Sequence, residues 1–183
     1  MDNKKFDIMD KEIDRSTKII NDLLGFTRVA KPTRIRSDIR IVINDALSRV
    51  RIAENIKLSK DFQSNLPTVM IDANQIGQIF INLIENACQA MADGGELRIS
   101  TRESKGFVEI EIGDSGCGIP EKELKKIFDP LFTTKPKGVG MGLAVCHGII
   151  EKHNGTINVR SQEGKGTNMY IRLPLEDKDA RPS

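Results

Sequence analysis

Two asparagines stand four residues apart in 82-NLIENACQA-90, a segment that is otherwise rich in leucine, isoleucine and alanine. On a helix this spacing places Asn82 and Asn86 on one face, and Gln89 lies on the same polar side. Asparagine is a mediocre helix former, but its carboxamide oxygen can join the oxygen ligands of Mg2+. The segment therefore indicates either a solvated polar face or a nucleotide site in which a carboxamide oxygen joins the ligands of Mg2+.

A second polar segment, 113-GDSGCGIP-120, follows directly after a strand-like run. Gly116 and Gly118 would let the backbone approach a flat ligand closely, and Asp114 could accept a hydrogen bond from an exocyclic amine such as that of adenine. An ordinary turn after a strand has the same composition, so both interpretations stay open for this segment alone.

Three alternating glycines in 138-GVGMGLAVC-146 lead into a helical pattern. The backbone N–H groups of such a loop and the N-terminus of the helix suit a phosphate group. The segment is not a P-loop, because no Gly-Lys-Ser/Thr follows, and its spacing does not fit a dinucleotide-binding fingerprint.

Two further loops carry weaker signals. In 127-IFDPLFTTKPK-137 the two phenylalanines can anchor a loop whose threonines and lysines reach anionic oxygens, although an ordinary surface loop is the alternative. In 164-GKGT-167, Thr167 could simply begin a strand.

Hydrophobic periodicity predicts the elements that must position these segments. Ser37 is expected to cap a first helix, and Asp72 with Gln75 forms a capping box for a second, whose core stripe would be Ile76, Phe80, Leu83, Ala87 and Ala90. The helices are expected at 39–53, 73–91 and 142–154, with a short one near 121–128. The strands are expected at 56–62, 68–71, 96–103, 107–114, 155–162 and 167–174.

Residues 1–31 carry apolar side chains at helical intervals and predict one long amphipathic helix that ends near Pro32. A lone helix cannot bury such a stripe, so it must pack on the following domain or on another chain. Residues 176–183 are expected to form a flexible tail.

The 183 residues include 28 basic and 26 acidic ones, so the net charge is only +2 and no nucleic-acid partner is indicated. No apolar run of about 18 residues exists, and we expect this portion to be cytoplasmic, which leaves a membrane anchor in the full-length protein open. Cys88, Cys117 and Cys146 lack metal-ligand spacing and are expected to be reduced, buried thiols.

The order of the motifs is more specific than any one of them: paired asparagines, Asp-x-Gly-x-Gly, a phenylalanine-bearing loop, Gly-x-Gly-x-Gly-Leu and Gly-x-Gly-Thr. In this order the sequence resembles the catalytic and ATP-binding domain of sensor histidine kinases, in the superfamily that includes DNA gyrase, the mismatch-repair ATPases and the heat-shock chaperone ATPases. The resemblance covers roughly residues 33–175 and implies a catalytic domain over 32–175. The implied fold is α/β (α+β), a two-layer sandwich of about five mixed strands with three helices on one face.

The resemblance also implies roles for residues. Asn86 would bind Mg2+, Asn82 would lie near the phosphates of ATP or ADP, and Asp114 would accept the adenine amine. Phe128 and Phe132 match the F box, and 128–141 would be the ATP lid. The nucleotide-binding residues implied are Asn82, Asn86, Gln89, Asp114, Gly116, Gly118, Ile119, Phe132, Thr133, Thr134, Lys135, Lys137, Gly138, Val139, Gly140, Met141, Gly142, Leu143 and Thr167.

The opening helix resembles the second helix of the dimerisation and histidine-phosphotransfer domain of these kinases. The helix that carries the phosphoacceptor histidine is absent, and His147 and His153 are expected to be surface or packing residues. The resemblance therefore implies a kinase domain that transfers the γ-phosphoryl group of Mg-ATP to a histidine of another segment and cannot label itself. The implied partners are that histidine helix, a second copy of the full-length chain and a response-regulator receiver domain.

One departure concerns mechanism. ATP-hydrolysing relatives carry a glutamate four residues before the metal-binding asparagine, whereas this sequence has Asn82, which cannot act as a base. Hydrolysis is therefore disfavoured relative to transfer to histidine. The alternatives are an ATPase or serine kinase of the same superfamily, or a non-catalytic dimerising module that senses nucleotide.

Overall fold

The computed structural model describes residues 31–135 and 138–175, so the predicted opening helix, Lys137 and the predicted tail lie outside the described residues. The helices are α2 (Ile39–Arg49), α3 (Ala73–Ala90), α4 (Glu121–Leu124) and α5 (Gly142–Lys152). The strands are β1 (Ile35–Ser37), β2 (Ile56–Phe62), β3 (Val69–Ile71), β4 (Gly95–Ser104), β5 (Phe107–Asp114), β6 (Thr156–Gln162) and β7 (Gly166–Pro174).

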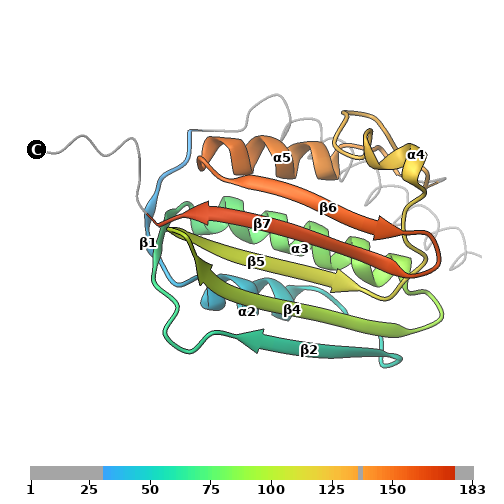
Figure 1. Ribbon diagram of the computed structural model, residues 1–183, viewed down its shortest axis with the longest axis horizontal. Helices are drawn as coiled ribbons and strands as arrows, with labels where there is room; N and C mark the ends of the chain where they lie inside the picture. The colour runs from blue at the N-terminus through green and yellow to red at the C-terminus, as the bar shows by residue number, and fades with distance from the viewer. Residues whose placement is uncertain (1–30, 136–137, 176–183) are drawn as a thin grey trace, which may run out of the picture.

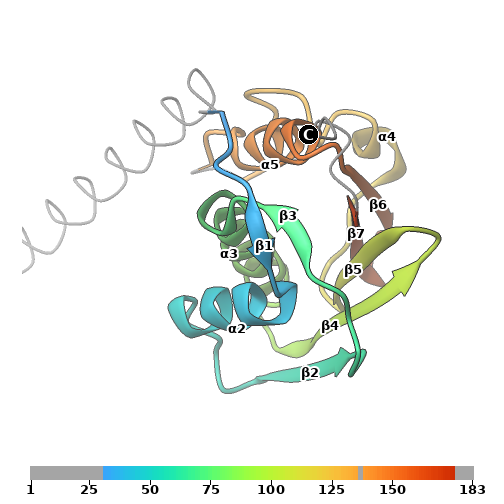
Figure 2. The same ribbon diagram turned by 90° about the vertical axis from the view of Figure 1, so that its left-hand side faces the viewer.

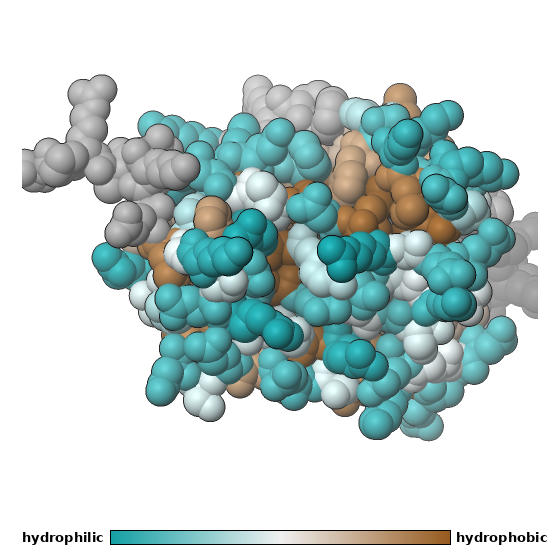
Figure 3. All heavy atoms as spheres, in the orientation of Figure 1, coloured by the Kyte–Doolittle hydropathy of each residue, from teal (hydrophilic) through white to brown (hydrophobic). Residues whose placement is uncertain are grey.

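Five of these strands form one mixed sheet in the order β2-β4-β5-β7-β6 (Figure 1). Strand β2 runs parallel to β4, whereas the other neighbours are antiparallel. Helices α2, α3 and α5 cover one face of the sheet, and the opposite face carries mostly hydrophilic side chains (Figures 2 and 3). The predicted two-layer α/β sandwich is therefore confirmed. No helix in the described part of the chain is long and apolar enough to cross a membrane.

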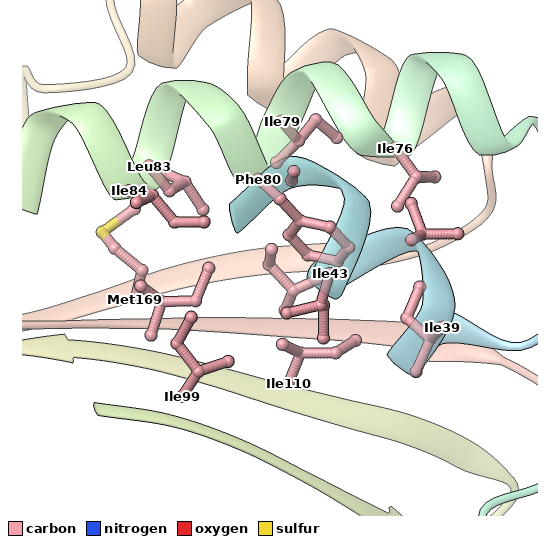
Figure 4. Packing of buried hydrophobic residues seen from close by; sticks show 14 of the residues in the cluster. Ile39, Ile43, Ile76, Ile79, Phe80, Leu83, Ile84, Ile99, Ile110 and Met169 are labelled. Atoms are coloured by element: carbon pink, nitrogen blue, oxygen red, sulfur yellow. The ribbon is translucent and has the colours of Figure 1, made fainter. Parts of the chain in front are cut away.

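The core lies between α3 and the sheet (Figure 4). Helix α3 has one buried apolar stripe, and polar residues lie outside it. In the predicted stripe, Ile76, Phe80, Leu83 and Ala87 are at most 4% exposed. Ala90, the last residue of α3, is only half-buried, and its carbonyl accepts a hydrogen bond from Cys117 N at 3.1 Å. The apolar stripe thus fixes which face of α3 remains for polar chemistry.

One expectation near the start of the domain was wrong. The N-cap of α2 is Asp38, whose carboxylate accepts from Arg40 N, because Ser37 is the last residue of β1 and donates its hydroxyl to Ile35 O. The predicted strand at 68–71 does form, as β3, but it pairs with β1 in a separate two-stranded sheet. β1 has three residues, which is too short to show a period in sequence.

The start of α3 and the end of α5 meet at the side of the domain where β1 lies (Figure 1). His153, 2% exposed, accepts a hydrogen bond from Asp72 N on Nε2 at 3.0 Å and donates from Nδ1 to Ile149 O at 2.8 Å. The Asp72 side chain caps α3 and also accepts from Thr33 N at 3.0 Å. His153 is thus a neutral packing residue, as expected.

Replacing His153 with alanine is expected to lower the free energy of unfolding by about 1–3 kcal/mol, because Asp72 N–H loses its acceptor. The matched change His147→Ala should cost at most about 0.5 kcal/mol, because that side chain is 41% exposed. Urea-induced unfolding of both variants measures the difference. Equal losses would contradict the assigned role of His153.

Candidate functional site

The polar face of α3 carries Asn82 and Asn86, which are half-buried, and Gln89, which is exposed. Asn82 donates from Nδ2 to Cys146 Sγ of α5 at 3.1 Å, and Asn86 Nδ2 lies 3.5 Å from Asn82 Oδ1. These contacts hold both carboxamides on the side of α3 that does not face the sheet. They also leave Asn86 Oδ1 directed away from Asn82.

The N-terminus of α5 lies against Asn82. A Cβ atom added to Gly142 would come within 2.7 Å of Asn82 Oδ1, so a larger residue here would displace the Asn82 carboxamide. The N-cap residue of α5, Met141, makes no side-chain cap bond. The first N–H groups of the helix therefore suit an anionic oxygen beside Asn82.

Lys135 reaches the same face of α3 from the loop before α5. Its Nζ donates to Asn86 Oδ1 at 2.7 Å and to Gln89 Oε1 at 2.6 Å. Two carboxamide oxygens thus converge on one cationic group. Since oxygen atoms of this type are the ligands that Mg2+ prefers, the residues fit a cation at this position. In the described part of the chain no group of three or more His, Cys, Asp or Glu side chains could hold a metal ion.

A second cluster lies where β5 ends, with Asp114 paired opposite Thr167 of β7. Asp114 Oδ1 accepts from Gly116 N at 2.9 Å. Burial raises the pKa of Asp114, and hydrogen bonds from the backbone N–H groups of Gly116 and Thr167 oppose that rise. A half-buried carboxylate whose charge is incompletely compensated can accept a further hydrogen bond from a ligand amine.

The two clusters are neighbours. Cys88, in the last turn of α3, has its pKa raised by burial and then by the negative charges of Glu85 and Asp114. The loop that follows Asp114 contacts the same helix, because Cys117 N donates to Ala90 O of α3 at 3.1 Å. The arrangement joins an anion-binding helix end, a cation site and a hydrogen-bond acceptor within one side of the sheet–helix sandwich.

Gly116 and Gly118 are required by the protein's own backbone. A Cβ atom on Gly116 would lie 2.5 Å from Ala90 O, and one on Gly118, where φ is +69°, would overlap the carbonyl of Gln162. The two glycines thus bring the loop after β5 against both α3 and the β6–β7 turn. This packing explains the glycines without a ligand, and it also fixes Asp114 beside α3.

Ser161 is a site residue that the sequence did not reveal. Its hydroxyl accepts from Ile119 N at 2.8 Å, lies 2.9 Å from Thr167 Oγ1 and donates to Gly166 O at 2.8 Å. It therefore ties the loop after β5 to the start of β7 around Asp114. Ile157 and Val159 share its face of β6, so a polar residue on an apolar face was the available signal.

Cys146 is the second residue that sequence reasoning missed. It is 2% exposed, and burial raises its pKa to about 12, so it faces Asn82 as a neutral thiol. Its position four residues after Gly142 places it on the face of α5 that meets α3. The expectation that all three cysteines are buried holds for Cys146 alone, because Cys88 is half-buried and Cys117 is exposed in the loop after β5.

The loop residues before α5 surround Lys135. Thr133 Oγ1 accepts from Lys135 N at 3.1 Å, and Gly138 N donates to Lys135 O at 3.0 Å. Gly140, with φ +73°, packs against the backbone of Phe132. Of the remaining predicted residues in this loop, Met141 is buried, Val139 and Leu143 are half-buried, and Thr134 is exposed.

Known proteins are similar to this chain in sequence and in fold. The family described as histidine kinase-, DNA gyrase B-, and HSP90-like ATPase matches residues 71–177. The sensor histidine kinase ZraS of Escherichia coli K12 is 39% identical over 174 residues, which are 92% of this chain and 37% of ZraS. The chain thus spans well under half the length of this relative.

Two solved structures have the same fold. The catalytic domain of histidine kinase ThkA is 29% identical and matches 78% of this chain and 95% of that domain with a TM-score of 0.69. ThkA in complex with the response regulator TrrA is 25% identical and matches 94% of this chain and 51% of that chain with a TM-score of 0.78. Since the family match covers more than half of the sequence and agrees with the observed sandwich, the chain belongs to the family of histidine kinase-, DNA gyrase B- and HSP90-like ATPases.

Proposed function

We propose that residues 32–175 are the ATP-binding catalytic domain of a sensor histidine kinase, which transfers the γ-phosphoryl group of ATP to a histidine outside this chain. The observation that carries the proposal is the convergence of Asn86, Gln89 and Lys135 beside the N-terminus of α5, with Asp114 close to the same helix. The histidine kinase names of ZraS and ThkA support it.

In this proposal Asp114 accepts a hydrogen bond from the exocyclic amine of adenine, and Thr167 and Ser161 hold that carboxylate in place. Asn82, the N–H groups at the start of α5 and the loop residues 128–141 surround the phosphates. Asn86 would hold Mg2+, and Gln89 would supply a second oxygen. Bound Mg2+ would neutralise the negative charge that develops on the phosphate oxygens.

The chemical step is a displacement at the γ-phosphorus. An imidazole nitrogen of the acceptor histidine forms the new P–N bond, the bond to the β–γ bridging oxygen breaks, and ADP leaves with that electron pair. The contribution of this chain is to position the nucleotide and to stabilise charge. It needs no general base of its own, because neutral imidazole is already a nucleophile.

Asn82 favours transfer over hydrolysis. A water molecule needs a base to become a nucleophile, and the position that holds a glutamate in ATP-hydrolysing relatives holds a carboxamide here. The Asn82 amide donates to the neutral thiol of Cys146 at 3.1 Å, so this group is engaged in orienting the site. This observation argues against the ATPase alternative.

Further partners follow from the same proposal. Residues 1–31 would belong to a helical dimerisation domain, so the full-length protein would be a homodimer. The complex of ThkA with TrrA supports a response-regulator receiver domain as the acceptor of the phosphoryl group from histidine. The domain would work in the cytoplasm, where ATP is available.

Incubating this chain with γ-labelled ATP and Mg2+ is expected to leave it unlabelled, because His153 is buried and no phosphoacceptor motif surrounds His147. Adding a separately purified protein that supplies the histidine-bearing helix should produce acid-labile label on that protein. Acid-labile label on His147 or His153 would contradict the proposal. Nucleotide binding without any transfer would favour the non-catalytic alternative.

A further inference from the structure

The ammonium group of Lys135 contacts Asn86 Oδ1, the oxygen atom that the proposed function assigns to Mg2+. This group lies 2.7 Å from Asn86 Oδ1 and 2.6 Å from Gln89 Oε1, although the two acceptors lie almost fifty residues away in sequence. Both distances are short for N–H···O bonds, as expected when the donor is charged. The protein thus holds a cationic group of its own at this position.

The contact is built by the loop as well as by the side chain. The backbone of Lys135 is held on both sides, by Thr133 Oγ1 at its N–H group and by Gly138 N at its carbonyl. A Cβ atom on Gly138 would lie 2.5 Å from Thr133 Oγ1, so the turn closes tightly around Lys135. The side chain is therefore directed at α3 by a local turn that is independent of α3.

An ammonium group and a magnesium ion cannot share this position. The repulsion between a +1 and a +2 charge about 4 Å apart is about 2 kcal/mol even in bulk water, and it grows in the lower effective dielectric of a protein surface. Neutral carboxamide oxygens offset little of that repulsion. The two cations must therefore exclude each other at Asn86 Oδ1.

We propose that Lys135 is a tethered cation that competes with Mg2+ for the Asn86–Gln89 oxygens and is displaced from them when Mg2+ binds with the nucleotide. The inference rests on the proposed function, because it assigns Mg2+ to Asn86. Because Lys135 competes with Mg2+, it sets the Mg2+ concentration at which the metal occupies the site.

The test is calorimetric titration of ADP at a series of Mg2+ concentrations, which needs no catalytic turnover. For Lys135→Met, the Mg2+ concentration that gives half of the gain in ADP affinity should fall about 3- to 10-fold, because the metal no longer displaces two hydrogen bonds to a charged donor. Lys126→Met removes an exposed lysine outside the site and should leave this concentration unchanged.

A second measurement follows the acceptors themselves. The side-chain amide NMR signals of Asn86 and Gln89 in the nucleotide-free protein should shift in Lys135→Met and stay in place in Lys126→Met. An unchanged or increased Mg2+ requirement in Lys135→Met, or unmoved amide signals, would overturn the inference. If the unaltered chain itself showed no Mg2+ dependence of ADP binding, the assignment of Mg2+ to Asn86 would fail instead.

Discussion

Replacing Asn86 with alanine is expected to remove the part of ADP affinity that depends on Mg2+, while the affinity measured in EDTA changes little. The expected loss in the presence of Mg2+ is about 100-fold, the upper end of what the loss of a supporting residue costs a metal site, because Asn86 would contact the ion directly. Calorimetric titration with ADP, with and without Mg2+, measures both affinities.

Gln78→Ala is the matched control for this change. Gln78 lies two turns earlier on α3, also carries a carboxamide and is exposed to solvent. Its replacement alters helix propensity and composition in a similar way without touching the site. An equal loss of affinity in the two variants, or an equal loss with and without Mg2+ in Asn86→Ala, would contradict a metal role for Asn86.

Replacing Asp114 with asparagine is expected to weaken ADP binding by about 10- to 100-fold, the worth of one hydrogen bond to a charged acceptor at a partly buried site. The affinity for GDP should change far less, so the preference for adenine over guanine should shrink. Asp61→Asn, an equal change at an exposed position of β2, should alter neither affinity. An unchanged ratio of ADP to GDP affinity in Asp114→Asn would contradict the assigned role.

Asp114 also gives ADP binding a pH dependence with a definite sign. Burial raises its pKa in the nucleotide-free protein, and a bound amine that donates to the carboxylate favours the ionised form. ADP affinity should therefore be complete above this raised pKa and decline as pH falls through it. In the nucleotide-free protein, the stability contributed by protonated Asp114 is lost as pH rises through the same value.

The parts of the fold that were predictable are those with a long, regular pattern. The apolar stripe of α3 and the capping position of Asp72 are local signals, and both appear as expected, with Ile76 and Phe80 fully buried. Strand β1 was not predictable, because its pairing with β3 is a tertiary contact between segments more than thirty residues apart. Ser37 was misplaced for the same reason, since β1 already uses it.

The candidate site shows the same division between local and tertiary information. The motif order could place Asn86 and Asp114 in one family pattern, because each motif is a short local signature. The contacts of Ser161, Cys146 and Lys135 depend on which elements the fold brings together, and no local pattern reports that. The motif associated Gly116 with the close approach of a ligand, whereas in the structure its close approach is to Ala90 of its own chain.

The central claim is that this side of the sandwich binds an adenine nucleotide together with Mg2+. The most direct measurement is calorimetric titration of the unaltered chain with ADP and GDP, each in the presence of Mg2+ and in EDTA. We predict binding of ADP that strengthens at least about 10-fold with Mg2+, and binding of GDP that is weaker by at least about 10-fold. Equal affinities for ADP and GDP, or an ADP affinity that is the same in Mg2+ and EDTA, would contradict the account.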